Sequence, residues 1–124
     1  MAKGDDIRER LVNFAVMVID LCEQLPKTQA SSHVSLQLLR AATAAAPNYA
    51  EARGAESARD FVHKLGIALK ELNEAEVWLD IVLRKEMAEP AHALQVREEC
   101  GALCRILAAS VRTAGAKLSR LNNA

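Results

Sequence analysis

The sequence predicts an all-α protein, an antiparallel up-down-up-down bundle of four helices. Hydrophobic residues make up 51% of the 124-residue chain but aromatic residues only 3%, a mixture that favours closely packed helices over a sheet. Apolar residues also recur along most of the chain at alternating spacings of four and three, which is the period of one apolar helix stripe. The connections between these stripes are short, so successive helices are expected to lie antiparallel.

The clearest stripe belongs to a third helix over residues 57–87, whose interior is broken by neither proline nor an on-stripe glycine. Ser57, followed by Asp60 three positions later, resembles a capping box and begins this helix. At 1.5 Å per residue the helix is about 40 Å long, so it needs partners of similar length. The stripe consists of Phe61, Leu65, Ala68, Leu72, Ala75, Leu79 and Val82.

The first helix is predicted over residues 5–25. Asp5 and Asp6 can cap it and are favourable at the positive end of the helix dipole. Pro26 disfavours a helical conformation at the residue before it and therefore ends the helix.

The second helix is predicted over residues 32–53, with Ser31 or Ser32 as its cap. Its middle is a run of very small side chains, where another helix can approach closely. Pro47 lacks an N–H and crowds the preceding turn, so we expect a kink there rather than an end, because the residues that follow still look helical.

The fourth helix is predicted over residues 90–121, with Pro90 in its first turn. The whole chain, residues 1–124, is expected to form a single domain. No second domain, internal repeat or low-complexity tract is visible in the sequence.

Charge and cysteine content place the protein in the cytoplasm. Sixteen basic and sixteen acidic residues give a formal charge of zero, which provides no general attraction to nucleic acid or acidic membranes. Three cysteines, an odd number without the spacing of a disulfide framework, indicate a reducing compartment. The charged N-terminus is unlike a signal peptide, and no apolar run is long enough to predict a membrane span.

The sequence predicts no catalytic, metal or cofactor site. Its two Asp/Glu-x-x-His pairs, which end at His63 and His92, fall at the starts of the third and fourth helices, at opposite ends of an antiparallel bundle. Cys100 and Cys104 are interpreted as small core thiols. The acidic cluster of the third helix is interpreted as a solvated or salt-bridged face; it consists of Glu71, Glu74, Glu76 and Asp80.

Two surfaces are candidates for contacts beyond the bundle. One is an edge of the third helix, interpreted either as an oligomer interface or as a widened core stripe; it contains Ile67, Glu74, Trp78 and Ile81. The other is the cationic end of the fourth helix, which carries no acid after Glu99 and could contact phosphates. Its alternative explanation is favourable placement at a helix C-terminus together with pairing to acids of the third helix. The candidate nucleic-acid-binding residues are Arg40, Arg53, Arg105, Arg112, Lys117 and Arg120.

The stretch LLRAATAAAPNYAEA, followed by FVHKLGIALKELNEAEVWL, resembles the four-helix-bundle family of 23S rRNA intervening-sequence proteins. It is also similar to the related accessory protein of diversity-generating retroelements. The small-residue run and the motif after it carry the resemblance; the motif residues are Pro47, Asn48, Tyr49 and Glu51, to which we assign a structural role. The resemblance covers roughly residues 11 to 84.

This resemblance implies a ring-like homopentamer without catalytic residues. For the retroelement branch it further implies contacts with nucleic acid and a reverse transcriptase through a strongly basic surface. The zero net charge of this chain departs from that pattern. We therefore expect a non-enzymatic homo-oligomeric module that contacts RNA or DNA, with a protein-binding scaffold independent of nucleic acid as the alternative.

Overall fold

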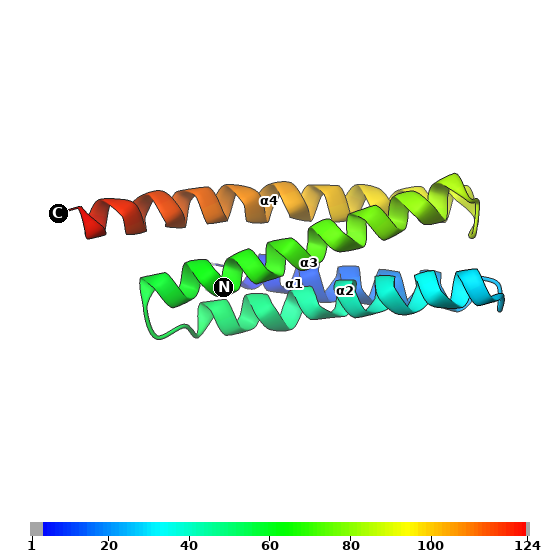
Figure 1. The fold of residues 1–124 in the computed structure, drawn as a ribbon, viewed down its shortest axis with the longest axis horizontal. Coiled ribbons are helices and arrows are strands. Elements are labelled where there is room, and N and C mark those ends of the chain that lie inside the picture. Colours follow the sequence, from blue (N-terminus) through cyan, green and yellow to red (C-terminus); the bar gives the residue numbers. More distant parts are fainter. Residues whose placement is uncertain (1–3, 124) are drawn as a thin grey trace.

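The computed structural model describes residues 4–123 and shows the predicted all-α, four-helix architecture (Figure 1). α1 packs against α2 and α4, and α3 packs against the same two helices, so the four form an antiparallel bundle. None of the described helices is long and apolar enough to cross a membrane. The helices are α1 (Asp5–Gln24), α2 (Gln29–Arg53), α3 (Ala58–Arg84) and α4 (Pro90–Asn122).

The predicted apolar stripes form the core. On α3 every stripe residue from Leu65 to Val82 is fully buried, whereas Phe61, at the start of the stripe, is only half-buried. The core stripe of α4 contains Val96, Leu103 and Leu107, all with no exposed surface. The 4–3 spacing therefore identifies the buried face of α1, α2 and α3 and of α4 as far as Leu107, because those positions repeat on one side of a helix. From Val111 onward the predicted stripe of α4 is only partly buried or exposed.

The starts of α1 and α2 differ from the prediction. α2 begins one turn earlier than expected, because Thr28 is the N-cap: its side chain accepts a hydrogen bond from the Ser31 N–H at 3.2 Å. Ser31, a predicted cap, is instead buried inside the first turn. α1 is preceded by Gly4, and its two aspartates lie in the first turn, where they complement the helix dipole without capping it.

The end of α3 also differs, whereas its start is as predicted. The Ser57 side chain accepts a hydrogen bond from the Asp60 N–H at 3.1 Å, which confirms the cap. The helix ends at Arg84 instead of residue 87, because Glu86 adopts a left-handed conformation with φ of 52°. The Met87 N–H then donates to the Val82 carbonyl and the Glu86 N–H to the Leu83 carbonyl, which is the bonding pattern of a Schellman motif.

Pro47 lies inside an uninterrupted α2, so the prediction that the helix does not stop there is confirmed. The proline supplies no N–H for the carbonyl four residues earlier. At the adjacent carbonyl, that of Ala44, the side chain of Asn48 adds a hydrogen bond of 2.8 Å. The small residues before the proline are buried against the neighbouring helices; they are Ala41, Ala42 and Ala45.

α1 and α4 differ in length, and this difference shapes one end of the bundle. α1 has 20 residues and α4 has 33, a difference of about 20 Å at 1.5 Å per residue. The last turns of α4 extend past the start of α1 (Figure 1). The position that α1 occupies elsewhere in the bundle is therefore not filled at this end by residues 4–123.

Candidate interaction surfaces

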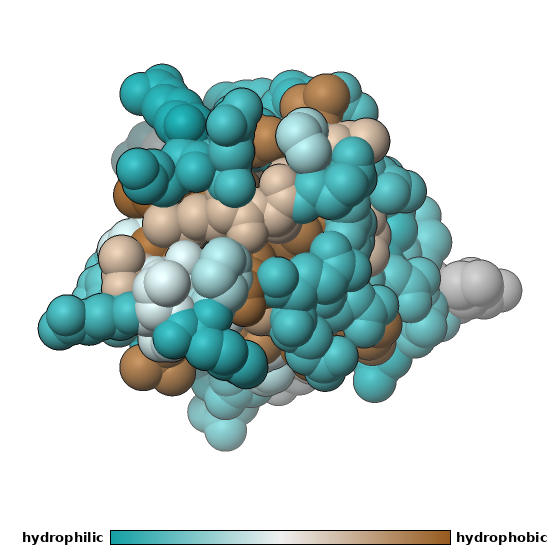
Figure 2. All heavy atoms as spheres, turned by 90° about the vertical axis from the view of Figure 1, so that its right-hand side faces the viewer, coloured by the Kyte–Doolittle hydropathy of each residue, from teal (hydrophilic) through white to brown (hydrophobic). Residues whose placement is uncertain are grey.

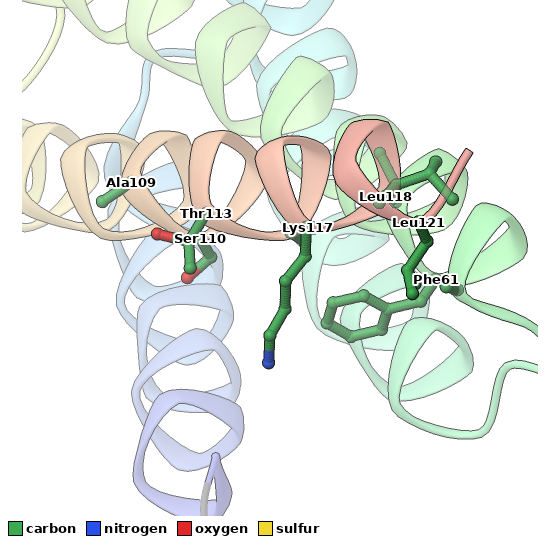
Figure 3. A pocket seen from close by; sticks show the side chains of 10 residues that line it. Phe61, Ala109, Ser110, Thr113, Lys117, Leu118 and Leu121 are labelled. Carbon is green, nitrogen blue, oxygen red and sulfur yellow. The ribbon is translucent and has the colours of Figure 1, made fainter. Parts of the chain in front are cut away.

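An apolar groove lies where α4 extends past α1. Its volume is about 500 Å³, and its walls come from the first turns of α3 and the last turns of α4. Phe61 of α3 lies close to Leu121 of α4, and Lys117 extends alongside them (Figure 3). The remaining lining residues are Ala58, Val62, Ala109, Ser110, Thr113, Ala114 and Leu118.

The groove was not predicted, although the sequence contained a signal for it. The predicted first helix is shorter than the fourth, and the apolar positions of the fourth helix continue to Leu121. An apolar stripe that continues beyond the end of its partner helix leaves apolar surface exposed to solvent. Leu121 is indeed 66% exposed.

The opposite end of the bundle, formed by the α1–α2 and α3–α4 connections, has a different surface. In the space-filling view of that end, hydrophilic side chains surround apolar atoms that appear as separate small areas (Figure 2). There Glu89 caps α4 by accepting hydrogen bonds from the N–H groups of Ala91 and His92. These two hydrogen bonds, chiefly that from His92, keep the pKa of Glu89 below its ordinary value.

The four predicted cations of α4, which all follow Glu99, are exposed. Within residues 4–123, none of them forms an ion pair, so pairing with acids of α3 does not account for them. Lys117 lines the groove, and the other three do not. They are Arg105, Arg112, Lys117 and Arg120.

The first half of α4 differs, because its arginine is paired. Arg97 lies 2.7 Å from Asp80 and 3.1 Å from Glu76, both on α3. These carboxylates raise the pKa of Arg97 above its ordinary value, chiefly through the hydrogen bond to Asp80. Pairing between α3 and α4 is therefore confined to the half of α4 that precedes the cationic end.

Arg40 and Arg53, the other two predicted nucleic-acid contacts, lie on α2, which does not pack against α4, and both contact acids. Arg40 pairs with Glu74 and lies 3.6 Å from Glu71, so it joins α2 to α3. Arg53 lies 2.8 Å from Asp5 and joins α2 to the start of α1. The structure thus does not bring these two together with the four cations of α4, and their role in nucleic-acid binding stays a prediction.

The predicted oligomer edge of α3 lies partly against α2. Trp78 is half-buried, donates its indole N–H to Glu74 at 3.1 Å, and meets the His33 ring edge-on at 5.8 Å. The hydrogen bond from Trp78 and that from Arg40 together lower the pKa of Glu74. Ile67 is half-buried and Ile81 is 37% exposed. A contact of this edge with another molecule remains a prediction.

One motif residue, Tyr49, joins the C-terminal half of α2 to the start of α1. Tyr49 is buried and donates its hydroxyl to the Gly4 carbonyl at 3.4 Å. Burial raises the pKa of Tyr49. Gly4 has φ of 93°, and a Cβ there would lie 2.8 Å from the Tyr49 hydroxyl oxygen, so this position favours glycine. Glu51, by contrast, is exposed.

The carboxylates of α3 form ion pairs, which confirms their interpretation as a salt-bridged face. Glu71 and Glu74 face Arg40, and Glu76 and Asp80 face Arg97. Residues 4–123 contain no group of three or more side chains suited to hold a metal ion.

Cys100 and Cys104 are buried, as expected of core thiols. The Cys100 thiol donates to the Leu72 carbonyl at 3.4 Å, and the Cys104 thiol together with burial raises the pKa of Cys100. A buried thiol with a raised pKa is a poor nucleophile, because the thiolate is the reactive form.

The family match decides the identification. The sequence matches the 23S rRNA-intervening sequence protein family over residues 5–109. The chain belongs to this family. A crystal structure of a protein of unknown function from the S23 ribosomal protein family of Bacteroides thetaiotaomicron is similar, with 31% sequence identity and a TM-score of 0.78. The alignment covers 85% of this chain and 97% of that one. No curated protein matches the sequence.

The family match covers only the first of the four cations of α4. Arg105 lies inside the matched region, whereas Arg112, Lys117 and Arg120 follow it. The match includes the motif of α2 and the acidic face of α3 but ends at residue 109, before most of the α4 residues that line the groove.

Proposed function

We propose that this protein is a non-enzymatic, self-assembling helical module that contacts the phosphate backbone of RNA or DNA. The observation that carries the proposal is the cationic end of α4. After Glu99 the helix carries four basic side chains and no acid, and all four are exposed without an ion pair in residues 4–123. Phosphate backbones are recognised mainly through such lysine and arginine contacts.

The distribution of charge supports this proposal despite the zero net charge of the chain. α1 carries five acids and two arginines, whereas the charged side chains of α4 after Glu99 are all basic, so charge is distributed unevenly between the helices. A local field over one face attracts an oppositely charged ligand even when the total charge is zero. Lys117 and Arg120 also lie in the last two turns of α4, at the end that projects past α1, where a nucleic-acid strand can approach.

Self-assembly would strengthen such a contact. One chain offers only a few cations, which gives weak binding. Several copies held in one assembly would engage one strand together, and the effective concentration of the second site would raise the overall affinity. A homopentamer is the assembly that we propose, on the basis of the family resemblance.

The proposal predicts that reversing the charge of three arginines weakens the binding of RNA. We expect the triple variant R105E/R112E/R120E to lose at least about tenfold in affinity for a fluorescent single-stranded RNA at low salt, because each lost contact removes a favourable phosphate interaction. The measurement is fluorescence anisotropy. The matched control is K27E/R84E/K85E, which changes the net charge equally at the opposite end of the bundle, where all three residues are exposed.

The outcomes of this comparison are distinct. An affinity retained by the control and lost by the α4 variant supports contact at the cationic end. Equal losses in both variants would show a general charge effect and contradict the proposed site.

The second candidate function is a protein-binding scaffold that does not contact nucleic acid. The apolar groove favours it, because exposed apolar surface of this kind is typical of protein interaction sites. Absence of RNA and DNA binding by the wild-type chain at low salt would favour this candidate. A reverse transcriptase is one partner that the proposed relation to retroelement accessory proteins suggests, and a cytoplasmic location suits both functions.

A further inference from the structure

We infer that the α3–α4 groove receives the outer face of α1 from a second copy of this chain. The inference rests on the proposed self-assembly and specifies the two surfaces that meet. The groove supplies one surface, and an exposed apolar stripe on α1 supplies the other.

The groove resembles a bundle position that lacks its helix. α4 continues past the start of α1, and Phe61 of α3 is only half-buried there, although it belongs to the core stripe. The groove residues of α4 include Leu118 and Leu121, with Lys117 beside them (Figure 3). The geometry therefore fits an apolar helix face, and the ammonium group of Lys117 favours acids next to it.

α1 presents such a face to solvent. Val12, Val16 and Ile19 lie four and three residues apart and are 36%, 50% and 39% exposed. These spacings place them in one stripe on the side of the helix away from the core. Three exposed acids flank the stripe, Glu9, Asp20 and Glu23, together with one exposed arginine, Arg8, which pairs with Glu9 at 2.7 Å.

Charge complementarity favours α1 over the exposed apolar residues of α3 and over the end of a second α4. The groove lies on the part of α4 that carries only cations, and the side chains beside the α1 stripe are three acids and one arginine. On α3 the exposed residues Val77 and Ile81 have Lys70 and Arg84 on the same side, and the nearby acids Glu74 and Asp80 are already paired with Arg40 and Arg97. A second α4 end would repel the groove, because both carry only positive charge. Opposite charges across an interface favour the correct partner and disfavour the others.

The two surfaces are different regions of one chain, so their contact is heterologous. Each copy would offer its α1 stripe to one neighbour and its groove to another, and such head-to-tail contacts form a ring when the rotation closes. Arg105, Arg112 and Arg120 do not line the groove, so they would stay available to a phosphate backbone in the assembly.

The test uses two variants that each disrupt one surface. Val16→Asp places a charge in the α1 stripe, and Leu121→Asp places one in the groove; both residues are half or more exposed, so the bundle is expected to fold. We expect wild type to sediment as a closed oligomer and each variant to sediment as a monomer. An equimolar mixture should give a 1:1 heterodimer, because one intact stripe and one intact groove remain.

Self-assembly and the pairing of the α1 stripe with the groove are tested by different outcomes. Val77→Asp, at a 57% exposed position of α3, should keep the wild-type assembly. A monomeric wild type would contradict self-assembly itself. An oligomeric wild type whose assembly survives both variants, or a mixture that stays monomeric, would overturn the pairing of stripe and groove while leaving self-assembly standing. Circular dichroism verifies that each variant is folded.

Discussion

Leu72→Ala is expected to lower the free energy of unfolding by about 2–5 kcal/mol, since truncating a buried leucine removes apolar contacts and leaves a cavity. Leu72 lies in the middle of α3 with no exposed surface, and its carbonyl accepts the Cys100 thiol. The helix cannot easily collapse into the space, because α2 and α4 hold it on both sides. Urea unfolding at fixed protein concentration measures the loss.

The control for this prediction is Val77→Ala on the same helix. Val77 is 57% exposed, so its truncation is expected to change the stability by less than about 0.5 kcal/mol. A Leu72→Ala variant as stable as Val77→Ala would mean that the α3 stripe does not form the core.

Ala45→Leu is expected to destabilise the bundle by about 1–3 kcal/mol, because the added carbons have no space between helices that approach closely. Ala45 is fully buried and belongs to the small-residue run before Pro47. The larger side chain must push α2 away from its neighbours or adopt a strained rotamer. Thermal unfolding monitored by circular dichroism measures the effect.

Ala50→Leu is the matched control, since it makes the same chemical change at an exposed position of the same helix. We expect it to leave the stability within about 0.5 kcal/mol of wild type. If Ala45→Leu were equally harmless, the close approach of α2 would not depend on its small residues.

The bundle could be predicted from the sequence because each helix carries one unbroken stripe with a strict period. Helix ends were less predictable, since they depend on single hydrogen bonds. Thr28 rather than a serine caps α2, and the left-handed Glu86 ends α3 before residue 87. A left-handed glutamate has no clear sequence signature, because this conformation usually favours glycine.

The candidate surfaces were predictable only in part. The lack of acids after Glu99 identified the cationic end of α4, and the structure shows that its basic residues are exposed. The pairing of Arg40 with Glu74 and of Arg53 with Asp5 joins positions 34 and 48 residues apart, which periodicity cannot relate. The groove depends on how far α1 and α4 overlap, and that overlap is a property of the packed bundle.

The salt dependence of RNA binding tests the proposed phosphate contact most directly. For wild type with a single-stranded RNA, log affinity should fall linearly with log salt, with a slope of about −0.7 for each phosphate contacted. Three arginine contacts predict a slope of about −2, and a larger value in an assembly that engages one strand through several copies. An affinity that does not change between about 50 and 200 mM salt, or no binding at the lower salt, would contradict the account.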